Sequence, residues 1–356
     1  MAIVSFGHLV RHAALHRYAL NIVPIETSTA LETALEAGHA QRAPLVLAPV
    51  VSSKIPGVDK ASFAACEAAA RDAHVPVSLI ALKAGAEADL ITAINLGCSG
   101  VCIQPSTAHF PQMVTEVKAL ADIARPCGIT IGAVLPNHLD ETLPDPRPAT
   151  AECIALAARA ALDFLDVDIC GDDDNGKRRA KLDYARLRRI HEGTSIPLSA
   201  RVAVEVQPDQ VDKLIDSGLN LVHHGTFSIG KEFLAQELRL WGSAGRAVEI
   251  LAQCPQLHPV AHVVEFNAPV DDLPRLNAFL REGRRRLAAI PGVRAVATGE
   301  AIADASRYRY CWLVIFANEN VVESFRHHPL NVNFSDNMLF SIPDDQLTID
   351  FRLTTE

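Results

Sequence analysis

Residues 76–85 read Pro-Val-Ser-Leu-Ile-Ala-Leu-Lys-Ala-Gly, and this stretch carries the pattern that decides the fold. Its run from 76 to 82 is almost continuously apolar, as in a strand that is buried on both faces. Strands of this kind are typical of parallel sheets covered by helices. The run ends at Lys83, so a charged side chain stands at the carboxyl end of a buried strand.

The same kind of apolar run recurs on both sides of this stretch, up to about residue 240. We predict eight strands, at 18–23, 44–50, 76–82, 99–104, 129–135, 163–169, 196–202 and 219–224. Amphipathic segments with helical spacing separate them. Eight βα units predict a (β/α)8 TIM barrel. An open doubly wound sheet is the weaker alternative, because no glycine-rich nucleotide-binding motif follows any of the strands.

The composition narrows the class of protein. A formal net charge of −9 disfavours nucleic-acid binding, which needs clustered basic residues. No apolar run reaches the roughly 20 residues that cross a bilayer, so we expect no membrane partner. The first residues lack the pattern of a secretory signal, which predicts a cytoplasmic protein. The eight cysteines form no CxxC pair, and we interpret them as small buried hydrophobic residues.

A second pattern begins after the last helix of the predicted barrel. Strands are expected at 261–267, 293–301, 308–317 and 347–353, with helices at 272–288 and 318–327. The order β-α-β-β-α-β predicts a ferredoxin-like α+β unit. The chain is therefore expected to consist of a barrel at 1–245, a linker at 246–260 and an α+β domain at 261–356.

Several stretches, in family order and spacing, resemble the class II (fructose- or tagatose-bisphosphate) aldolase family. Tyr18-Ala-Leu-Asn-Ile-Val-Pro-Ile-Glu resembles its first strand, and Leu182-Asp-Tyr-Ala-Arg-Leu-Arg-Arg-Ile resembles its sixth helix. Asn220-Leu-Val-His-His-Gly-Thr resembles its eighth strand and phosphate-binding turn. Together the matches span nearly all of residues 1–240. The resemblance implies the TIM barrel and chemistry of the aldol or retro-aldol type.

The chain differs from this family at the positions of the metal ligands. The family holds zinc with three histidines and moves protons with an aspartate at the end of its third strand. The aspartate falls on Lys83, and the histidines fall on Ala84, on or near Asn175, and on Ala200 or Arg201. Amide, methyl and guanidinium groups are poor zinc ligands at the roughly 2.0–2.2 Å that the ion requires. We therefore expect no metal at the family position, while Mg²⁺ or Mn²⁺ at another site stays open.

The C-terminal unit resembles the dimeric α/β-barrel (Dabb, stress-responsive) family. His262-Val-Val-Glu-Phe, Ile290-Pro-Gly-Val, Tyr308-Arg-Tyr and His328-Pro329 carry the resemblance. The second histidine that this family usually has is Asn331 here. The resemblance implies that two sheets pair, so we expect a homo-oligomer, a dimer or a higher assembly, formed through this domain.

Residues at the carboxyl ends of barrel strands, and in the loops that follow, face the active site of such barrels. Lys83 could be a base, an anchor for an anion or a Schiff-base nucleophile, and the alternative is a lysine that reaches into solvent. Our catalytic candidates are Lys83, Asp168, His138 and His223. Our candidates for substrate contact are Asn21, Glu26, Ser52, Gln104, Arg201, His224, Gly225 and Thr226.

Three groups of residues near the predicted strand ends keep alternatives open. Asp166 and Asp168 alternate on one predicted strand and would share a face, either in a charge network or metal site, or as a structural ion-pair cluster. Only one of His223 and His224 can face inward, as a general base or as a hydrogen-bonded core residue. The acidic loop 172–177 could cap the site, bind a hard cation or be a plain solvated loop.

These features predict a carbon–carbon lyase of the aldolase type that acts on a small oxygenated, anionic substrate without the family's zinc. One alternative is enolisation, isomerisation or hydrolysis on the same barrel, because a fold does not fix its function. The other is a non-catalytic binding or scaffold protein.

Overall fold

The structure, a computed structural model, describes residues 3–49, 60–107, 109–135, 148–172, 178–202, 206–223, 230–268, 273–303, 305–338 and 346–354. The chain divides into two compact units. The first contains Met1–Leu90, Cys98–Arg125 and Ile129–Gln256. The second contains Ile91–Gly97, Pro126–Gly128 and Leu257–Glu356.

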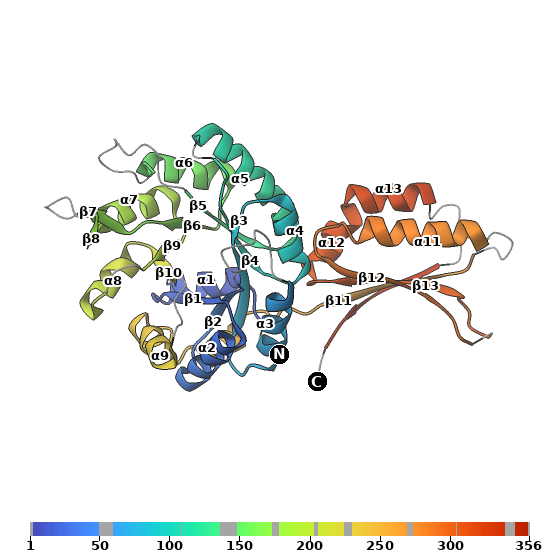
Figure 1. Ribbon diagram of the computed structural model, residues 1–356, viewed down its shortest axis with the longest axis horizontal. Helices are drawn as coiled ribbons and strands as arrows, with labels where there is room; N and C mark the ends of the chain where they lie inside the picture. Colours follow the sequence, from blue (N-terminus) through green and yellow to red (C-terminus); the bar gives the residue numbers. More distant parts are fainter. Residues whose placement is uncertain are drawn as a thin grey trace. The chain divides into compact units, whose positions relative to one another are not determined.

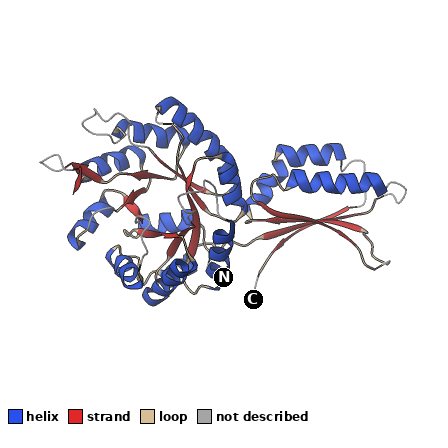
Figure 2. Cartoon of the chain, viewed as in Figure 1, coloured by secondary structure: helices blue, strands red, loops and turns tan. Residues whose placement is uncertain are grey.

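The first unit is the predicted barrel of parallel strands, closed on itself (Figure 2). In barrel order the strands are β1 (Leu20–Ile25), β10 (Leu219–His223), β9 (Leu198–Arg201), β6 (Phe164–Val167), β5 (Thr130–Val134), β4 (Gly100–Ile103), β3 (Val77–Ala84) and β2 (Leu45–Pro49). All eight overlap the strands expected from the sequence. β1, β2 and β4 are buried at every position, as the continuous apolar runs require.

Helices follow the strands and form the outer layer of this unit (Figure 1). They are α2 (Ser28–Gln41), α3 (Lys60–Asp72), α4 (Glu87–Asn95), α5 (Phe110–Ala124), the short 3-10 turn η1 (Arg125–Cys127), α6 (Thr150–Ala160), α7 (Tyr184–Thr194), α8 (Pro208–Asp216) and α9 (Lys231–Leu240). Side chains cap two of them: Thr27 accepts from the Ala30 amide before α2, and Asp183 accepts from the Arg186 amide before α7. Among the described residues, no helix is long and apolar enough to cross a membrane.

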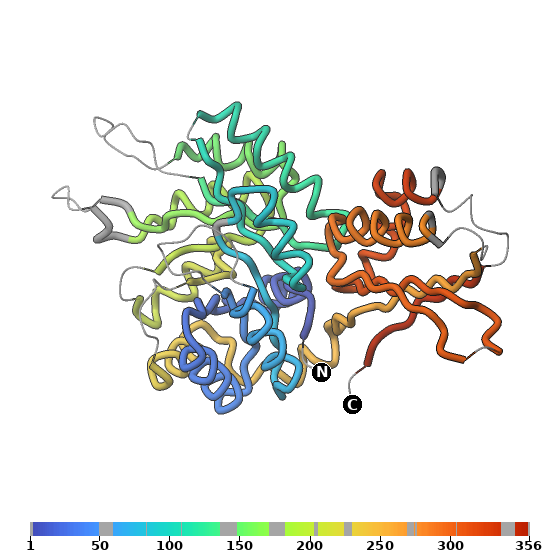
Figure 3. Tube along the Cα trace, turned by 45° about the vertical axis from the view of Figure 1, so that its right-hand side comes forward, coloured from blue at the N-terminus to red at the C-terminus, as the bar shows by residue number. Residues whose placement is uncertain are grey.

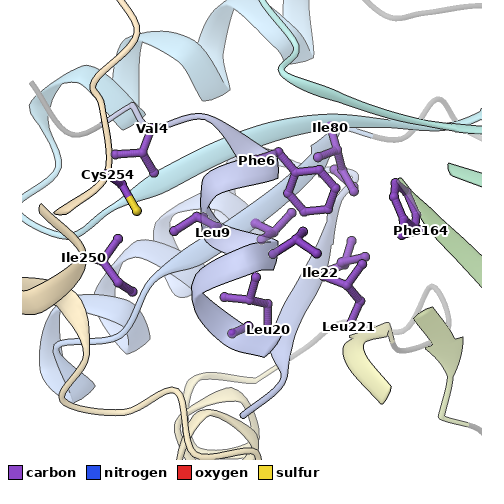
Figure 4. Close-up of a cluster of buried hydrophobic side chains, with 14 of the residues drawn as sticks. Val4, Phe6, Leu9, Leu20, Ile22, Ile80, Phe164, Leu221, Ile250 and Cys254 are labelled. Carbon is purple, nitrogen blue, oxygen red and sulfur yellow. The ribbon is translucent and has the colours of Figure 1, made fainter. Parts of the chain in front are cut away.

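Helix α1 (Phe6–Leu15), which the sequence pattern did not predict, closes the barrel at the amino ends of its strands. The Phe6 amide donates to Ser99 Oγ at 3.2 Å, just before β4 begins. The Phe6 ring lies edge-on to Phe164 at 5.6 Å inside the apolar cluster drawn in Figure 4. A Cβ atom at Gly100 would collide with the Phe6 ring, so glycine is required at that position. We call this end the base and the opposite end the mouth.

Two other segments differ from the sequence prediction. The expected linker 246–260 contains helix α10 (Ala247–Gln253), and its residue Ile250 packs in the same interior cluster as α1. Strands β7 (Cys170–Asp172) and β8 (Arg178–Leu182) pair as an antiparallel ribbon after β6. The sequence around residue 172 is rich in turn-forming residues, and this composition predicts a loop and not two short strands.

The second unit has the predicted ferredoxin-like order. Its elements are β11 (Val260–Phe266), α11 (Leu273–Leu287), β12 (Val293–Glu300), β13 (Tyr310–Phe316), α12 (Asn320–His327), α13 (Pro329–Met338) and β14 (Gln346–Arg352). The strands form an antiparallel sheet in the order β12-β13-β11-β14. Helix α13 was not expected, because the prediction ended the second helix at residue 327.

Helices cover one face of this sheet (Figure 3). Phe279 of α11 and Phe334 of α13 pack on Trp312 of β13. Strand register puts another set of apolar residues on the opposite face, where β14 exposes Ile349 by 39% and Phe351 by 49%. The sheet therefore has one packed face and one open apolar face.

Candidate active site

A histidine and a carboxylate meet at the mouth, where the barrel strands end. His223 is the last residue of β10, and Asp166 is the third residue of β6. Nε2 of His223 lies 3.0 Å from Oδ1 of Asp166, within hydrogen-bond distance. The two side chains are 18% and 17% exposed, so the pair is sheltered while part of its surface stays open to solvent.

The strand order places this pair inside the barrel. β9 lies between β10 and β6, so side chains from these two strands can meet only on the concave inner face. Leu221 and Phe164, two residues earlier on each strand, belong to the interior cluster, and residues two apart share a face. The pair therefore caps the apolar interior at the end where TIM barrels carry their active sites. His223 therefore faces inward.

A buried thiol stands near the same carboxylate. Burial raises the pKa of Cys102 well above its ordinary value, and the negative charge of Asp166 raises it further. A thiol in this state stays protonated at neutral pH and is a poor nucleophile. None of the eight cysteines, all of which lie among the described residues, forms a disulfide, and all but Cys311 are buried, which agrees with their interpretation as small hydrophobic residues.

The backbone of β3 is irregular at Lys83. Leu82 pairs with Cys102, and Ala84 pairs with the next residue, Ile103, so Lys83 is an extra residue in the ladder. Bulges of this kind are over-represented beside active sites, where they redirect a side chain. The side chain of Lys83 itself lies outside the described part of the chain.

Three expected substrate contacts stand at strand ends. Arg201 is the last residue of β9, is in register with His223, and is exposed. Glu26 directly follows β1 and Gln104 directly follows β4, and both are exposed. The Gln104 amide donates to the Ala84 carbonyl at 3.2 Å, which holds it beside the end of β3. These positions surround the mouth.

Asn21 requires a correction. Its neighbours Leu20 and Ile22 both belong to the interior cluster, so the side chain of Asn21 lies on the opposite face of β1, toward the helices. It is completely buried, and its amide nitrogen and oxygen have no hydrogen-bond partner among the described residues. Asn21 is therefore not placed to touch a substrate inside the mouth.

Asp168 also differs from its expected place. β6 ends at Val167, so Asp168 does not continue the alternation that was predicted to align it with Asp166. Its Oδ1 accepts a hydrogen bond from the Cys170 amide at 3.0 Å, and its backbone carbonyl accepts from Arg186 at 2.8 Å. These contacts are those of a turn that holds the chain between β6 and β7.

The remaining expected site residues fall outside the described residues. They are His138 among the catalytic candidates, and Ser52, His224, Gly225 and Thr226 among the candidates for substrate contact. The acidic stretch after Asp172 belongs with them up to residue 177.

Comparison with known proteins identifies the barrel. Residues 4–228, well over half of the chain, match the family of class II fructose-bisphosphate aldolases. The chain belongs to this family. The aldolase resemblance seen in the sequence is thereby confirmed.

Individual relatives are distant. A fructose-bisphosphate aldolase from Thermus caldophilus is 24% identical over 229 residues, which cover 61% of this chain and 73% of the relative. The YdjI aldolase from Escherichia coli K12 superposes with a TM-score of 0.56 at 18% identity, over 69% of this chain and 99% of that structure. For the second unit, a Dabb family protein with a ferredoxin-like fold from Mesorhizobium loti matches 28% of this chain and 99% of its own, at 21% identity and a TM-score of 0.26.

The residues present do not fit the zinc site of the aldolase family. Ala84 and Ala200 are buried alanines, and Arg201 carries a cation. In the described part of the mouth, His223 and Asp166 are not joined by a third histidine, cysteine or carboxylate within metal-binding distance. A stable zinc site needs at least three protein ligands, which the described part of the mouth does not bring together.

A group of three such side chains does exist at the base, and the sequence analysis did not single it out. His12 of α1 and His16, the residue that caps the carboxyl end of α1, converge with Glu249 of α10. Two histidines four residues apart on a helix were a visible signal, because such residues share one face. Nothing in the sequence indicated that residue 249 lies beside them.

Proposed function

We propose that the barrel is an aldolase-type lyase that makes or breaks a carbon–carbon bond in a small, oxygenated, anionic substrate, without zinc at the family position. The observation that carries the proposal is the hydrogen bond between His223 and Asp166 inside the mouth of a class II aldolase barrel. A histidine held by a carboxylate is a common acid–base device in enzymes. The replaced ligand positions support the second part of the proposal.

The carboxylate fixes the role of each imidazole nitrogen. An ionised Asp166 can only accept, so Nε2 of His223 carries the proton and donates to it. Nδ1 then holds a free lone pair and can accept a proton from a substrate. When it does, Asp166 stabilises the imidazolium that forms.

In the cleavage direction, Nδ1 of His223 takes the proton from the hydroxyl group on the carbon β to the substrate carbonyl. The freed electron pair forms the carbonyl group of the aldehyde product, and the carbon–carbon bond breaks. Its electrons move onto the remaining carbonyl fragment, which becomes an enolate, or an enamine if Lys83 has formed a Schiff base with loss of water. The imidazolium returns its proton to the new carbanionic carbon, and water hydrolyses the adduct where one formed.

Two cations support an anionic substrate. Arg201 is exposed at the end of β9, at the level of His223, where its guanidinium can bind a carboxylate or phosphate group. Lys83 stands at the bulge at the end of β3, at the position of the family's catalytic acid. A positive charge there would stabilise the developing enolate.

Deuterium exchange tests this proposal. The protein is incubated in D2O with short ketoses, with and without phosphate, and NMR follows aldehyde release and deuterium uptake beside the carbonyl. We expect both in the wild type, and a loss of about 10²–10⁴-fold in His223→Gln and in Asp166→Asn. His327→Gln, a histidine paired with Glu323 on the second unit, is the matched control. Equal rates in wild type and His223→Gln would contradict the assigned role.

We also propose that the chain forms a homo-oligomer through the open face of the second unit's sheet. Ile349 and Phe351 of β14 share this face with Leu313 and Ile315 of β13. Exposed apolar patches of this kind mark interaction surfaces, and two copies of one sheet face can cover each other symmetrically. Phe351→Glu should lower the mass found by light scattering, while Thr348→Glu, on the other face, should not. An unchanged mass in Phe351→Glu would contradict this interface.

A further inference from the structure

The strongest unassigned feature of the molecule lies at the base of the barrel. His12 lies in α1, His16 caps the carboxyl end of this helix one turn later, and Glu249 reaches them from α10. One ligand atom from each residue lies within 4.8 Å of the other two. All three residues belong to the first unit, so the barrel alone builds this group.

One nitrogen atom of this group is buried and lacks a hydrogen-bond partner among the described residues. His12 is only 6% exposed, and its Nε2 has no hydrogen-bond partner among the described residues. Oε1 of Glu249 is 3.8 Å away, which is too far for a hydrogen bond. Buried polar atoms are nearly always paired, because an unpaired one loses its water without compensation. A bound metal ion would supply the partner that this atom needs.

The opposite nitrogen of the same ring is already held. Nδ1 of His12 lies 3.0 Å from the hydroxyl group of Tyr18, which is itself buried. An Nδ1–H that donates to this oxygen leaves the lone pair on Nε2, aimed at the group. Histidine ligands of metals almost always have their second nitrogen fixed by such a partner.

The distances suit a tetrahedral ion. Two ligand atoms at roughly 2.0–2.2 Å from one tetrahedral centre lie roughly 3.3–3.6 Å apart. Oε1 of Glu249 lies 3.5 Å from Nδ1 of His16 and 3.8 Å from Nε2 of His12. The rings of His12 and His16 are stacked, with centroids 4.2 Å apart and an interplanar angle of 20°. At least one ring must therefore rotate out of the stack before both lone pairs and Glu249 meet one ion, with a fourth position left for water. His16 and Glu249 are 29% and 34% exposed, which gives an ion access from solvent.

We propose that His12, His16 and Glu249 bind a divalent transition metal ion, zinc in the first place, which joins α1 to α10 at the base of the barrel. Two imidazoles and one carboxylate are a zinc ligand set, whereas Mg²⁺ and Ca²⁺ prefer sites made of oxygen. The site is separate from the reaction at the mouth and does not rest on the function proposed for it. Its role is structural: it fastens the helix that closes the barrel.

Arg246 is the positively charged neighbour whose repulsion would weaken metal binding. Its guanidinium lies 3.4 Å from Oε2 of Glu249 and over the ring of Tyr18, at 5.3 Å from the ring centre. Because Arg246 uses Oε2, Oε1 remains free for the metal. A cation this close weakens the binding of a second cation, so Arg246→Gln should bind zinc more tightly than the wild type does.

Metal titration of the full chain tests the proposal. Zinc affinity is measured by competition with a chromophoric chelator, and Co²⁺ is added as a substitute whose visible absorption reports tetrahedral coordination. We expect one tight zinc per chain, a tetrahedral cobalt spectrum, and a higher melting temperature with zinc. His16→Ala and Glu249→Gln should each lose the cobalt spectrum and weaken zinc binding at least tenfold. Tyr18→Phe should weaken it by about 10–100-fold, as expected for the partner of a ligating histidine.

Two controls locate the ion. His327→Ala removes a histidine that lies beside a carboxylate elsewhere in the chain, and should leave zinc binding unchanged. His223→Gln removes the histidine of the mouth and should also leave it unchanged. Zinc binding that persists in both His16→Ala and Glu249→Gln, or that is lost in His223→Gln, would overturn the proposal. A wild type that binds zinc no better than His16→Ala would overturn it as well.

Discussion

At the mouth of the barrel one histidine, His223, meets one carboxylate, Asp166, beside an exposed arginine. At the base, two histidines from the helix that closes the interior and its carboxyl end converge with Glu249. In the function that we propose, the mouth works without the zinc ligands of the aldolase family and uses ionisable groups that can move protons. The base has the ligands for an ion. It lies at the opposite end of the strands from the groups of the mouth. We propose that the same residue types serve different purposes at the two ends of the barrel.

The strands explain why both arrangements coexist. Between the two ends lies a closely packed apolar interior that includes Phe6, Leu221 and Phe164 (Figure 4). This packing excludes water and keeps the charges of one end away from those of the other. Changes at the mouth should therefore alter chemistry and leave stability intact, and changes at the base should do the reverse.

The largest effect is expected at Lys83. Lys83→Ala should reduce lyase turnover by at least about 10³-fold, because the variant loses either a covalent nucleophile or the cation that stabilises the enolate. Its melting temperature should stay unchanged, because residue 83 lies at the bulge near the end of β3, after the apolar run 76–82. Lys118→Ala, an exposed lysine that pairs with Asp122 on α5, is the matched control.

Borohydride distinguishes the two roles of Lys83. A substrate adduct trapped on this residue would establish a Schiff-base mechanism. If no adduct forms and Lys83→Arg keeps substrate affinity, the lysine acts as an electrostatic anchor. Full activity in Lys83→Ala would contradict both roles and shift the search to His138, which follows β5 in the sequence.

The corresponding experiment at the base is Phe6→Ala. The Phe6 side chain is completely buried, and its removal should lower the free energy of unfolding by about 3–5 kcal/mol. Leu15→Ala on the same helix, at a side chain that is 78% exposed, should change it by less than about 0.5 kcal/mol. Chemical denaturation measures both. Turnover per folded molecule should be unchanged in Phe6→Ala, and a large loss would show that the two ends are coupled.

The sequence predicted the barrel well because its eight strands are buried on both faces, which leaves uninterrupted apolar runs. The helices α1 and α10 lacked such a signal. At the mouth, Arg201 and His223 could be placed because each ends a strand. Asn21 could not, because a single residue of register decides which face a side chain takes. Glu249 could not be linked to His12 either, because only the folded chain brings them together.

A smaller effect is expected at Arg201. Arg201→Gln removes a cation that can bind the anionic group of the substrate, and such hydrogen bonds contribute about 1.5–3 kcal/mol. KM should therefore rise by about 10–100-fold, with a smaller change in kcat, because an anchor binds ground state and transition state alike. Arg189→Gln on the exposed side of α7 is the control. An unchanged KM for anionic substrates would exclude Arg201 as their anchor.

Removal of metal should have the smallest effect on the chemistry, and it tests the separation of the two ends most directly. Chelation should lower the melting temperature, because an ion that binds only the folded chain stabilises it by mass action. Turnover measured below that temperature should stay within about twofold, since the acid–base pair of the mouth needs no ion. His16→Ala is the variant in which this test is decisive, because it removes a ligand of the proposed site at the base. Purified His16→Ala should contain far less than one zinc per chain by elemental analysis, and it should remain active. If this variant still holds stoichiometric zinc, and chelation removes the zinc and the activity together, the ion lies at the mouth and the reaction depends on it.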